Sequence, residues 1–242
     1  MLRATFVWCL SLPLLVSGQT SLKLTLGREA IIGGTGITLT GVGSLLAQHS
    51  AHTTPPAIDL MNVPDFDRVA VHQWSLQAHR GSNLLFGATA VAAIAGSIVN
   101  QHGERPLLPV AIIAESTLLS AGLTNTVKEL VRRPRPYMYN ADVPPSLHNP
   151  DNDYVSFWSG HTANTAAITF STAYMVQRSD ASRGVKTATW IGAALAPAAM
   201  GYMRVRAGRH FPTDVLTGYL VGAVVGIAVP YFHRAEKKPF GQ

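Results

Sequence analysis

The feature that most constrains this chain is a series of apolar runs, each close to the length that crosses a lipid bilayer. The five strongest cover residues 83–99, 107–127, 160–177, 186–203 and 213–231. A helix rises about 1.5 Å per residue, so about 20 apolar residues cross a hydrocarbon core about 30 Å thick. No strand-like alternation of apolar and polar residues is sustained between them. The sequence therefore predicts an all-α, membrane-embedded helical bundle.

A weaker, glycine-rich run at 29–47 brings the expected number of spanning helices to about five to six. Membrane helices tolerate glycine where two helices approach closely. Charged residues make up 13% of the chain, against about 25% in typical soluble domains. The mean hydropathy of +0.18 is modest, so composition alone leaves a water-soluble helical protein open.

The two ends of the chain have distinct compositions. Residues 1–18 are expected to be a secretory signal peptide or, alternatively, a first membrane helix. Residues 19–82 combine the weak apolar helix with a polar loop, in which we expect a short amphipathic helix at Val69–Ala78. Residues 233–242 form a basic tail, expected in the cytoplasm. The single cysteine, Cys9, excludes an intramolecular disulfide.

The net charge of +6 comes from basic residues in short loops between apolar runs, not from a continuous basic stripe. This distribution argues against a nucleic-acid partner. Both sides of the threaded bundle carry arginine and lysine, so a positive-inside count does not fix the orientation. If the cations in 128–159 and 204–212 bind phosphate, those segments are functional exceptions and face outward.

The first segment with chemistry-bearing residues runs from Lys128 to Pro136. Lys128 ends an apolar helix, and Arg135 follows two helical turns later, on the same face if the helix continues. Together they suit a tetrahedral dianion, because arginine offers a bidentate fork and lysine a point charge. Taken alone, the segment also fits a basic membrane flank.

The second segment, Ser156 to Thr162, immediately precedes an apolar helix. Free backbone N–H groups and the positive end of the helix dipole favour an anion there. Gly160 allows close approach to the backbone, Ser159 can donate a hydrogen bond, and His161 can donate a proton. A helix cap with an incidental histidine is the structural alternative.

The third segment runs from Arg204 to Asp214. Pro212 suits the first turn of a helix, which places Asp214 in that turn and close to His210. A carboxylate that accepts from one imidazole nitrogen leaves the other nitrogen free to act as a nucleophile. A purely structural cluster is the alternative for this segment too.

In order and spacing the three segments resemble the type 2 phosphatidic acid phosphatase (PAP2) superfamily, in its bacterial integral-membrane branch. Its signature is Lys-x6-Arg-Pro, then Pro-Ser-Gly-His, then Ser-Arg-x5-His-x3-Asp, and the resemblance covers about 83–232. That stretch is the expected catalytic core. Two positions depart from the signature. Trp158 replaces the proline and is expected to loosen the turn before Ser159, and Met203 replaces the serine before Arg204.

The resemblance implies hydrolysis of a phosphate monoester or pyrophosphate through a phosphohistidine. It makes His210 the nucleophile, Asp214 the residue that orients it and His161 the general acid. The implied phosphate-binding residues are Lys128, Arg135, Ser159, Gly160 and Arg204. No metal and no cofactor is implied, because fixed cations supply the charge that Mg²⁺ supplies in other phosphoryl-transfer enzymes. A secondary role, contact with an anionic head group, is expected for four further arginines: Arg132, Arg133, Arg206 and Arg209.

The expected substrate is a phosphorylated lipid, and the expected location is the bacterial inner membrane, multi-pass, with the site facing the periplasm. We expect no obligatory protein partner. A soluble periplasmic acid phosphatase shares these motifs but is opposed by the long uncharged runs at 83–99 and 213–231. A vanadium haloperoxidase would be much longer. A non-enzymatic lipid-binding protein is opposed by the retained pair of His210 and Asp214.

Overall fold

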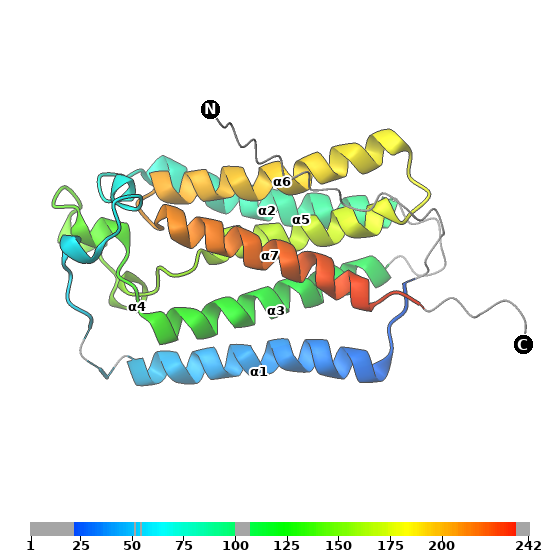
Figure 1. Ribbon diagram of the computed structural model, residues 1–242, viewed down its shortest axis with the longest axis horizontal. Coiled ribbons are helices and arrows are strands. Elements are labelled where there is room, and N and C mark those ends of the chain that lie inside the picture. Colours follow the sequence, from blue (N-terminus) through cyan, green and yellow to red (C-terminus); the bar gives the residue numbers. More distant parts are fainter. Residues whose placement is uncertain (1–21, 51, 54, 100–106, 236–242) are drawn as a thin grey trace, which may run out of the picture.

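The computed structural model describes residues 22–50, 52–53, 55–99 and 107–235, and the long helices lie side by side (Figure 1). They are α1 (Leu26–Ser50), α2 (Leu76–Val99), α3 (Leu108–Val131), α5 (Gly160–Gln177), α6 (Arg183–Arg206) and α7 (Pro212–Phe232). The short elements are α4 (Pro150–Asp153) and the 3-10 turns η1 (Leu60–Asn62), η2 (Arg68–Ala70), η3 (Pro136–Tyr139) and η4 (Pro145–Leu147). The all-α prediction is confirmed. The expected signal peptide lies outside the described residues, as does the tail beyond residue 235.

Four helical stretches are long and apolar enough to cross a membrane: Leu26–Ser50, Leu76–Ile98, Leu108–Tyr139 and Pro212–Phe232. Helices α5 and α6, which we expected to span as well, are outside this set. Helix α5 lies in the middle of the bundle, between α2, α3, α6 and α7, and most of its side chains are buried. Two of its hydroxyls bond back to its own carbonyls, Thr169 Oγ1 to Thr165 O at 3.0 Å and Thr172 Oγ1 to Ile168 O at 2.9 Å. A helix enclosed by its neighbours does not need the apolarity that lipid contact demands.

Helices α5 and α7 run in the same direction and touch backbone to backbone. A Cβ added at Gly222 of α7 would lie 2.0 Å from the carbonyl oxygen of Ala163 on α5, so only glycine fits there. At the beginning of the two helices, Ser159 N donates to Asp214 O at 3.0 Å. The close packing therefore brings two helix N-termini together at one end of the bundle.

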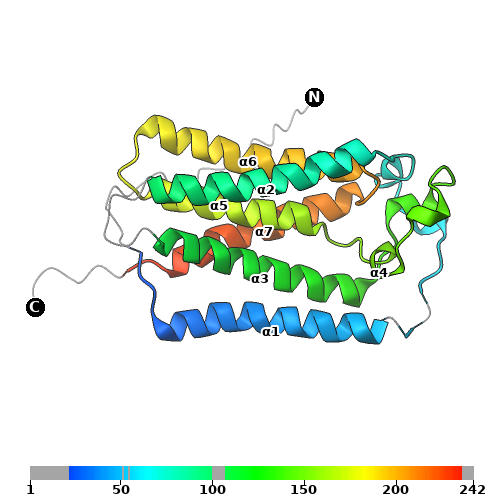
Figure 2. The same cartoon turned by 180° about the vertical axis from the view of Figure 1, so that it is seen from behind.

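Helix α1 contains the expected weak run and lies at the edge of the bundle, beside α3 (Figure 2). This contact is also close, since a Cβ at Gly122 of α3 would lie 2.7 Å from Gly36 O of α1. The glycines of this run therefore allow two membrane helices to pack tightly.

The predicted amphipathic helix at Val69–Ala78 is wrong. The segment forms the single turn η2, and α2 begins only at Leu76, where Ser75 Oγ accepts from Ala78 N at 3.1 Å. Its apolar side chains do not line one face of a helix. Instead Ala70 and Val71 pack with Val63 against Phe211, in a small separate cluster beside the beginning of α7.

Candidate active site

The end of the bundle where α3 ends and α5 and α7 begin holds the three predicted segments together. Lys128, Arg135, His161 and Arg204 all act electrostatically on the imidazole of His210. The N-termini of α5 and α7 add Ser159, Gly160 and Asp214 to the same region. All eight predicted site residues are thus assembled around one histidine, although they come from four helices and their connections.

Lys128 and Arg135 converge by a different route from the one predicted. Helix α3 ends at Val131, and Arg132 adopts a left-handed backbone (φ 48°), so the two cations do not share a continuous helix face. Arg135 is 5% exposed. Its Nε donates to Asn152 O at 2.6 Å and its Nη1 to Arg209 O at 3.0 Å. These neutral carbonyls fix the guanidinium without cancelling its charge.

Gly160 lies where α3 approaches the beginning of α5, and its tight contact is with Thr124. A Cβ at this position would lie 3.1 Å from Thr124 Cγ2 and 3.8 Å from Lys128 Nζ. The ammonium group therefore stands beside the free backbone N–H groups of a helix N-terminus. That combination of a cation and a helix dipole suits an anion.

His210 is held in one tautomer. Its Nδ1 lies 2.8 Å from Ser156 O, and because a carbonyl only accepts, Nδ1 carries the proton. The lone pair is then on Nε2, which lies 3.5 Å from Arg135 Nη1. Burial lowers the pKa of His210 well below its ordinary value, and the charge of Arg135 lowers this pKa further. The buried imidazole is therefore neutral and has a free nitrogen directed at the cations.

Asp214 acts on His210 indirectly. Its nearest carboxylate oxygen is 3.7 Å from His210 Nδ1, too far for the direct hydrogen bond that we expected. Instead Oδ2 accepts from Ser156 Oγ at 2.5 Å and from Phe211 N at 2.9 Å. Asp214 thus holds the residue whose carbonyl accepts the imidazole proton.

Arg133 is not the head-group contact that the sequence indicated. Its guanidinium pairs with Asp214 Oδ1 at 2.5 Å and with Asp67 Oδ2 at 2.7 Å, and it lies 4.0 Å from the ring centroid of Phe211. Asp67 is fully buried and also accepts from Thr213 N at 2.9 Å. This Asp67–Arg133–Asp214 chain links the N-terminal loop to the site, and motif spacing gave no sign of it.

Arg204 has two neighbours on α2 that sequence reasoning also missed. Its Nη1 lies 3.1 Å from His79 Nδ1 and 3.3 Å from Ser82 Oγ. Its Nε is buried without a hydrogen-bond partner among the described residues. A buried donor left unmatched in this way requires an explanation, and a phosphate oxygen would supply the acceptor.

His161 is half-buried at the first turn of α5. Its Nε2 lies 3.0 Å from Asn83 Oδ1, and its ring packs against Phe86 with centroids 5.6 Å apart. We expected Trp158 to loosen the turn before Ser159. The structure shows the opposite, because Trp158 Nε1 donates to Thr124 Oγ1 at 2.7 Å. This hydrogen bond ties the turn to α3.

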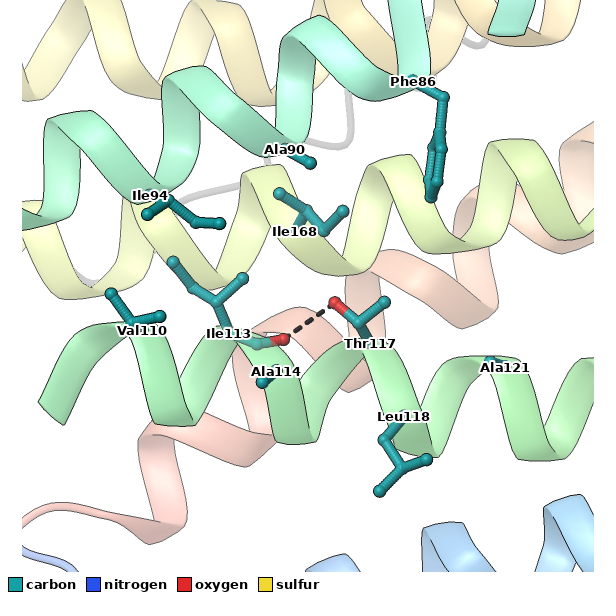
Figure 3. Close-up of a pocket in the computed structure, with 10 residues that line it drawn as sticks. All are labelled: Phe86, Ala90, Ile94, Val110, Ile113, Ala114, Thr117, Leu118, Ala121 and Ile168. Carbon is teal, nitrogen blue, oxygen red and sulfur yellow. Dashed lines mark hydrogen bonds between the residues drawn. The ribbon is translucent and has the colours of Figure 1, made fainter. Parts of the chain in front are cut away.

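An apolar groove of about 470 Å³ begins at Phe86 and extends between α2, α3 and α5 (Figure 3). Ala90 and Ile94 line it from α2, and Ile113 and Thr117 from α3. The Thr117 hydroxyl is satisfied by Ile113 O at 2.8 Å, so the groove offers no unpaired polar group at that point. An apolar chain therefore fits beside the site.

Comparisons with known proteins agree with the predicted resemblance. The sequence profile of the PAP2 superfamily matches residues 109–238. The crystal structure of the first transmembrane PAP2 type phosphatidylglycerolphosphate phosphatase from Bacillus subtilis matches this structure with a TM-score of 0.51 at 23% sequence identity. The match covers 82% of this chain and 95% of that one. No curated protein matches the sequence. With its four apolar spans, the shared fold indicates a multi-pass membrane protein.

Proposed function

Because this chain belongs to the PAP2 superfamily, which supports phosphatase activity, we propose that it hydrolyses a phosphate monoester or pyrophosphate of a membrane lipid. The observation that carries the proposal is the neutral imidazole of His210, with its free Nε2 among cations. In this proposal His210 is the nucleophile and the reaction passes through a phosphohistidine.

Charge balance supports phosphate as the ligand. Arg133 is neutralised by its two carboxylates, whereas Arg135 is held by carbonyls and Arg204 by a histidine and a serine. With Lys128, this leaves three cations near His210 for a phosphate dianion. Ser159 Oγ and the N–H of Gly160 add donors at the N-terminus of α5.

In the first step His210 Nε2 attacks phosphorus, and the bond from phosphorus to the leaving oxygen breaks as the N–P bond forms. The leaving alkoxide takes a proton from His161. Burial, then the charges of Arg204 and Lys128, lower the pKa of His161 to about 3 without substrate. The bound dianion supplies the opposite charge, which raises this pKa and favours the protonated form. The imidazolium that forms on His210 keeps its Nδ1–H on Ser156 O and is stabilised by Asp214 at 3.7 Å.

In the second step water attacks phosphorus of the phosphohistidine, and the N–P bond breaks. His161, now neutral, takes a proton from that water, and inorganic phosphate leaves. The His161 imidazole thus donates the proton of the first step and accepts the proton of the second, so it is protonated again at the end of the cycle.

The apolar groove supports a lipid rather than a soluble ester. It begins at Phe86, which packs on the proposed general acid His161, so the leaving group would continue directly into the groove. We assign the groove to an acyl or isoprenoid chain. The proposal also includes an inner-membrane location with the site facing the periplasm, and a catalytic core at 83–232 that depends on Asp67 from outside it.

Phosphate release by detergent-purified protein tests the proposal. A panel of lipid phosphates and soluble esters is compared for the wild type, His210→Ala and His72→Gln, whose exposed histidine serves as the matched control. We expect turnover of a lipid phosphate that is lost only in His210→Ala, and an acid-labile, base-stable phosphoenzyme in the wild type after a brief incubation.

Two outcomes would contradict the proposal. Activity that persists in His210→Ala would exclude this histidine as the nucleophile. Faster cleavage of soluble esters than of any lipid would instead favour the acid-phosphatase alternative.

A further inference from the structure

A second cluster of polar side chains, of which His233 is fully buried and both glutamates are partly exposed, lies at the opposite end of the bundle from His210. Glu29 comes from the first turn of α1, Glu115 from α3, and His233 directly follows α7. Each offers one ligating atom, and the three atoms lie within 4.8 Å of one another. His233 Nε2 is 3.0 Å from Glu115 Oε2 and 3.3 Å from Glu29 Oε2.

The imidazole of His233 is fully buried, and its orientation is fixed from behind. Its Nδ1 lies 2.7 Å from Val229 O, so Nδ1 carries the proton and donates to this carbonyl. Nε2 is then the nitrogen that faces the two carboxylates, and it is a metal ligand in the unprotonated imidazole. A histidine whose far nitrogen is bonded to a backbone carbonyl is the usual arrangement of a metal ligand.

Glu29 and Glu115 bring two carboxylates to one imidazole. Among the described residues, the ion pairs of Glu29 and Glu115 are both with this one imidazole. Glu29 Oε1 accepts from Thr25 N at 3.0 Å, which leaves Oε2 to the cluster. Glu115 Oε2 is enclosed and accepts no hydrogen bond from a described residue, despite its short distance to His233. Two partly buried carboxylates beside one imidazole are stabilised by a positive charge between them, which a divalent cation would supply.

We propose that Glu29, Glu115 and His233 bind a divalent cation of the zinc type. One nitrogen and two oxygen ligands suit Zn²⁺, whereas Mg²⁺ and Ca²⁺ prefer oxygen alone. Zinc ligand bonds of about 2.0–2.2 Å place neighbouring ligands of a tetrahedral site about 3.4 Å apart. The observed separations of 3.0 and 3.3 Å from the nitrogen to the two oxygens need little adjustment. Two carboxylates also balance the charge of the ion.

The geometry gives this cation a structural part. It would join α1 to α3 and to the end of α7, where Leu22 and Arg234 already form a β-bridge and Lys23 N donates to His233 O at 2.8 Å. Helix α1 lies at the edge of the bundle and precedes the superfamily match at 109–238 (Figure 1). The length of α7, about 30 Å, separates the cluster from His210, so the cation takes no part in phosphoryl transfer.

Binding of zinc alone tests the proposal. The full chain in detergent is treated with a chelator, freed of it, and titrated with Zn²⁺ by calorimetry and by thermal unfolding. We expect one ion per chain and a higher Tm, with little effect of Mg²⁺ or Ca²⁺. Glu115→Gln and Glu29→Gln should each weaken zinc binding about tenfold or more. His49→Asn, an exposed histidine in the last turn of α1, is the matched control and should bind as the wild type does.

Three outcomes would overturn the proposal. The first is that the wild type neither binds zinc nor gains stability from it. The second is that His49→Asn loses as much zinc affinity as the glutamate variants. The third is that the wild type does not respond to zinc and Glu115→Gln has a higher Tm than the wild type. The last result would show that a shared proton balances the cluster. If Glu115→Gln does not elute as a single folded species, Glu29→Gln decides, because its carboxylate is partly exposed.

Discussion

The two ends of the bundle contain polar clusters of opposite composition. At one end lie Lys128, Arg135 and Arg204, and none of the three forms an ion pair within 4.0 Å with a carboxylate of the described residues. At the other end Glu29 and Glu115 share a single imidazole. Isolated charges are costly in a low-dielectric interior, and for this reason we propose an anion as the ligand at the first end and a cation at the second.

The catalytic end also contains a cluster that is already balanced. Arg133 and Arg135 are two residues apart. Arg133 forms ion pairs with Asp67 and Asp214, whereas Arg135 donates to two carbonyls and lies beside His210 Nε2 without an ion pair among the described residues. The difference separates an arginine that holds the site together from one that is available to substrate. Substitutions at these two positions should therefore fail in different ways.

The largest effect is expected for Arg133→Met, which leaves Asp67 and Asp214 as unpaired buried carboxylates. Breaking a buried pair in this way costs about 3–5 kcal/mol, so Tm should fall by many degrees, and Arg133→Lys should recover part of the loss. Thermal unfolding in detergent measures this. An unchanged Tm in Arg133→Met would show that the Asp67–Arg133–Asp214 chain does not stabilise the fold.

Arg135→Gln should have the opposite pattern, with a large loss of turnover and no loss of thermal stability. Loss of one donor to the transition state costs about 10²–10³ in kcat, while Tm should be unchanged or higher because an uncompensated buried charge is removed. Kinetics and unfolding on the same preparation test the contrast. A large fall in Tm would place Arg135 in the same structural class as Arg133.

Ser156→Ala tests the indirect link from Asp214 to His210. The change removes the 2.5 Å hydrogen bond to Asp214 but keeps the Ser156 carbonyl that accepts from His210. A hydrogen bond to a charged group contributes about 1.5–3 kcal/mol, so kcat should fall about tenfold or more with KM unchanged. A change confined to KM would contradict this positioning role.

The pH profile should show a smaller effect. Burial, then Arg135, lowers the pKa of His210, so the imidazole stays neutral and active until the pH falls well below the ordinary range of histidine. Removing the charge in Arg135→Gln raises this pKa and should move the acid limb of kcat/KM to higher pH. A limb that does not move would mean that His210 is not the titrating group.

The smallest effect on turnover is expected at the end of the bundle that holds Glu29, Glu115 and His233. Glu115→Gln should change thermal stability and zinc response but leave kcat at low temperature nearly as in the wild type, because the cluster lies about 30 Å from His210. Phosphate release from lipid well below Tm measures this. A large loss of kcat would show that the two ends are coupled.

The sequence by itself determined the all-α fold and most of the long helices, and it predicted the eight site residues that the bundle brings together. Apolar runs of spanning length specify helices through local burial and hydrogen bonding. The three motifs of the PAP2 superfamily carry the site because their spacing is local as well, as in Arg204, His210 and Asp214. The roles of these residues remain a proposal for the experiments above.

The tertiary structure decided which charges are neutralised. Arg133 meets Asp67 across 66 residues and His233 meets Glu29 across 204, and no local pattern links either pair. The prediction of direct contact between Asp214 and His210 failed for the same reason, since Ser156 comes between them from another segment. Such pairings depend on which helix ends meet, and only the packed bundle fixes that.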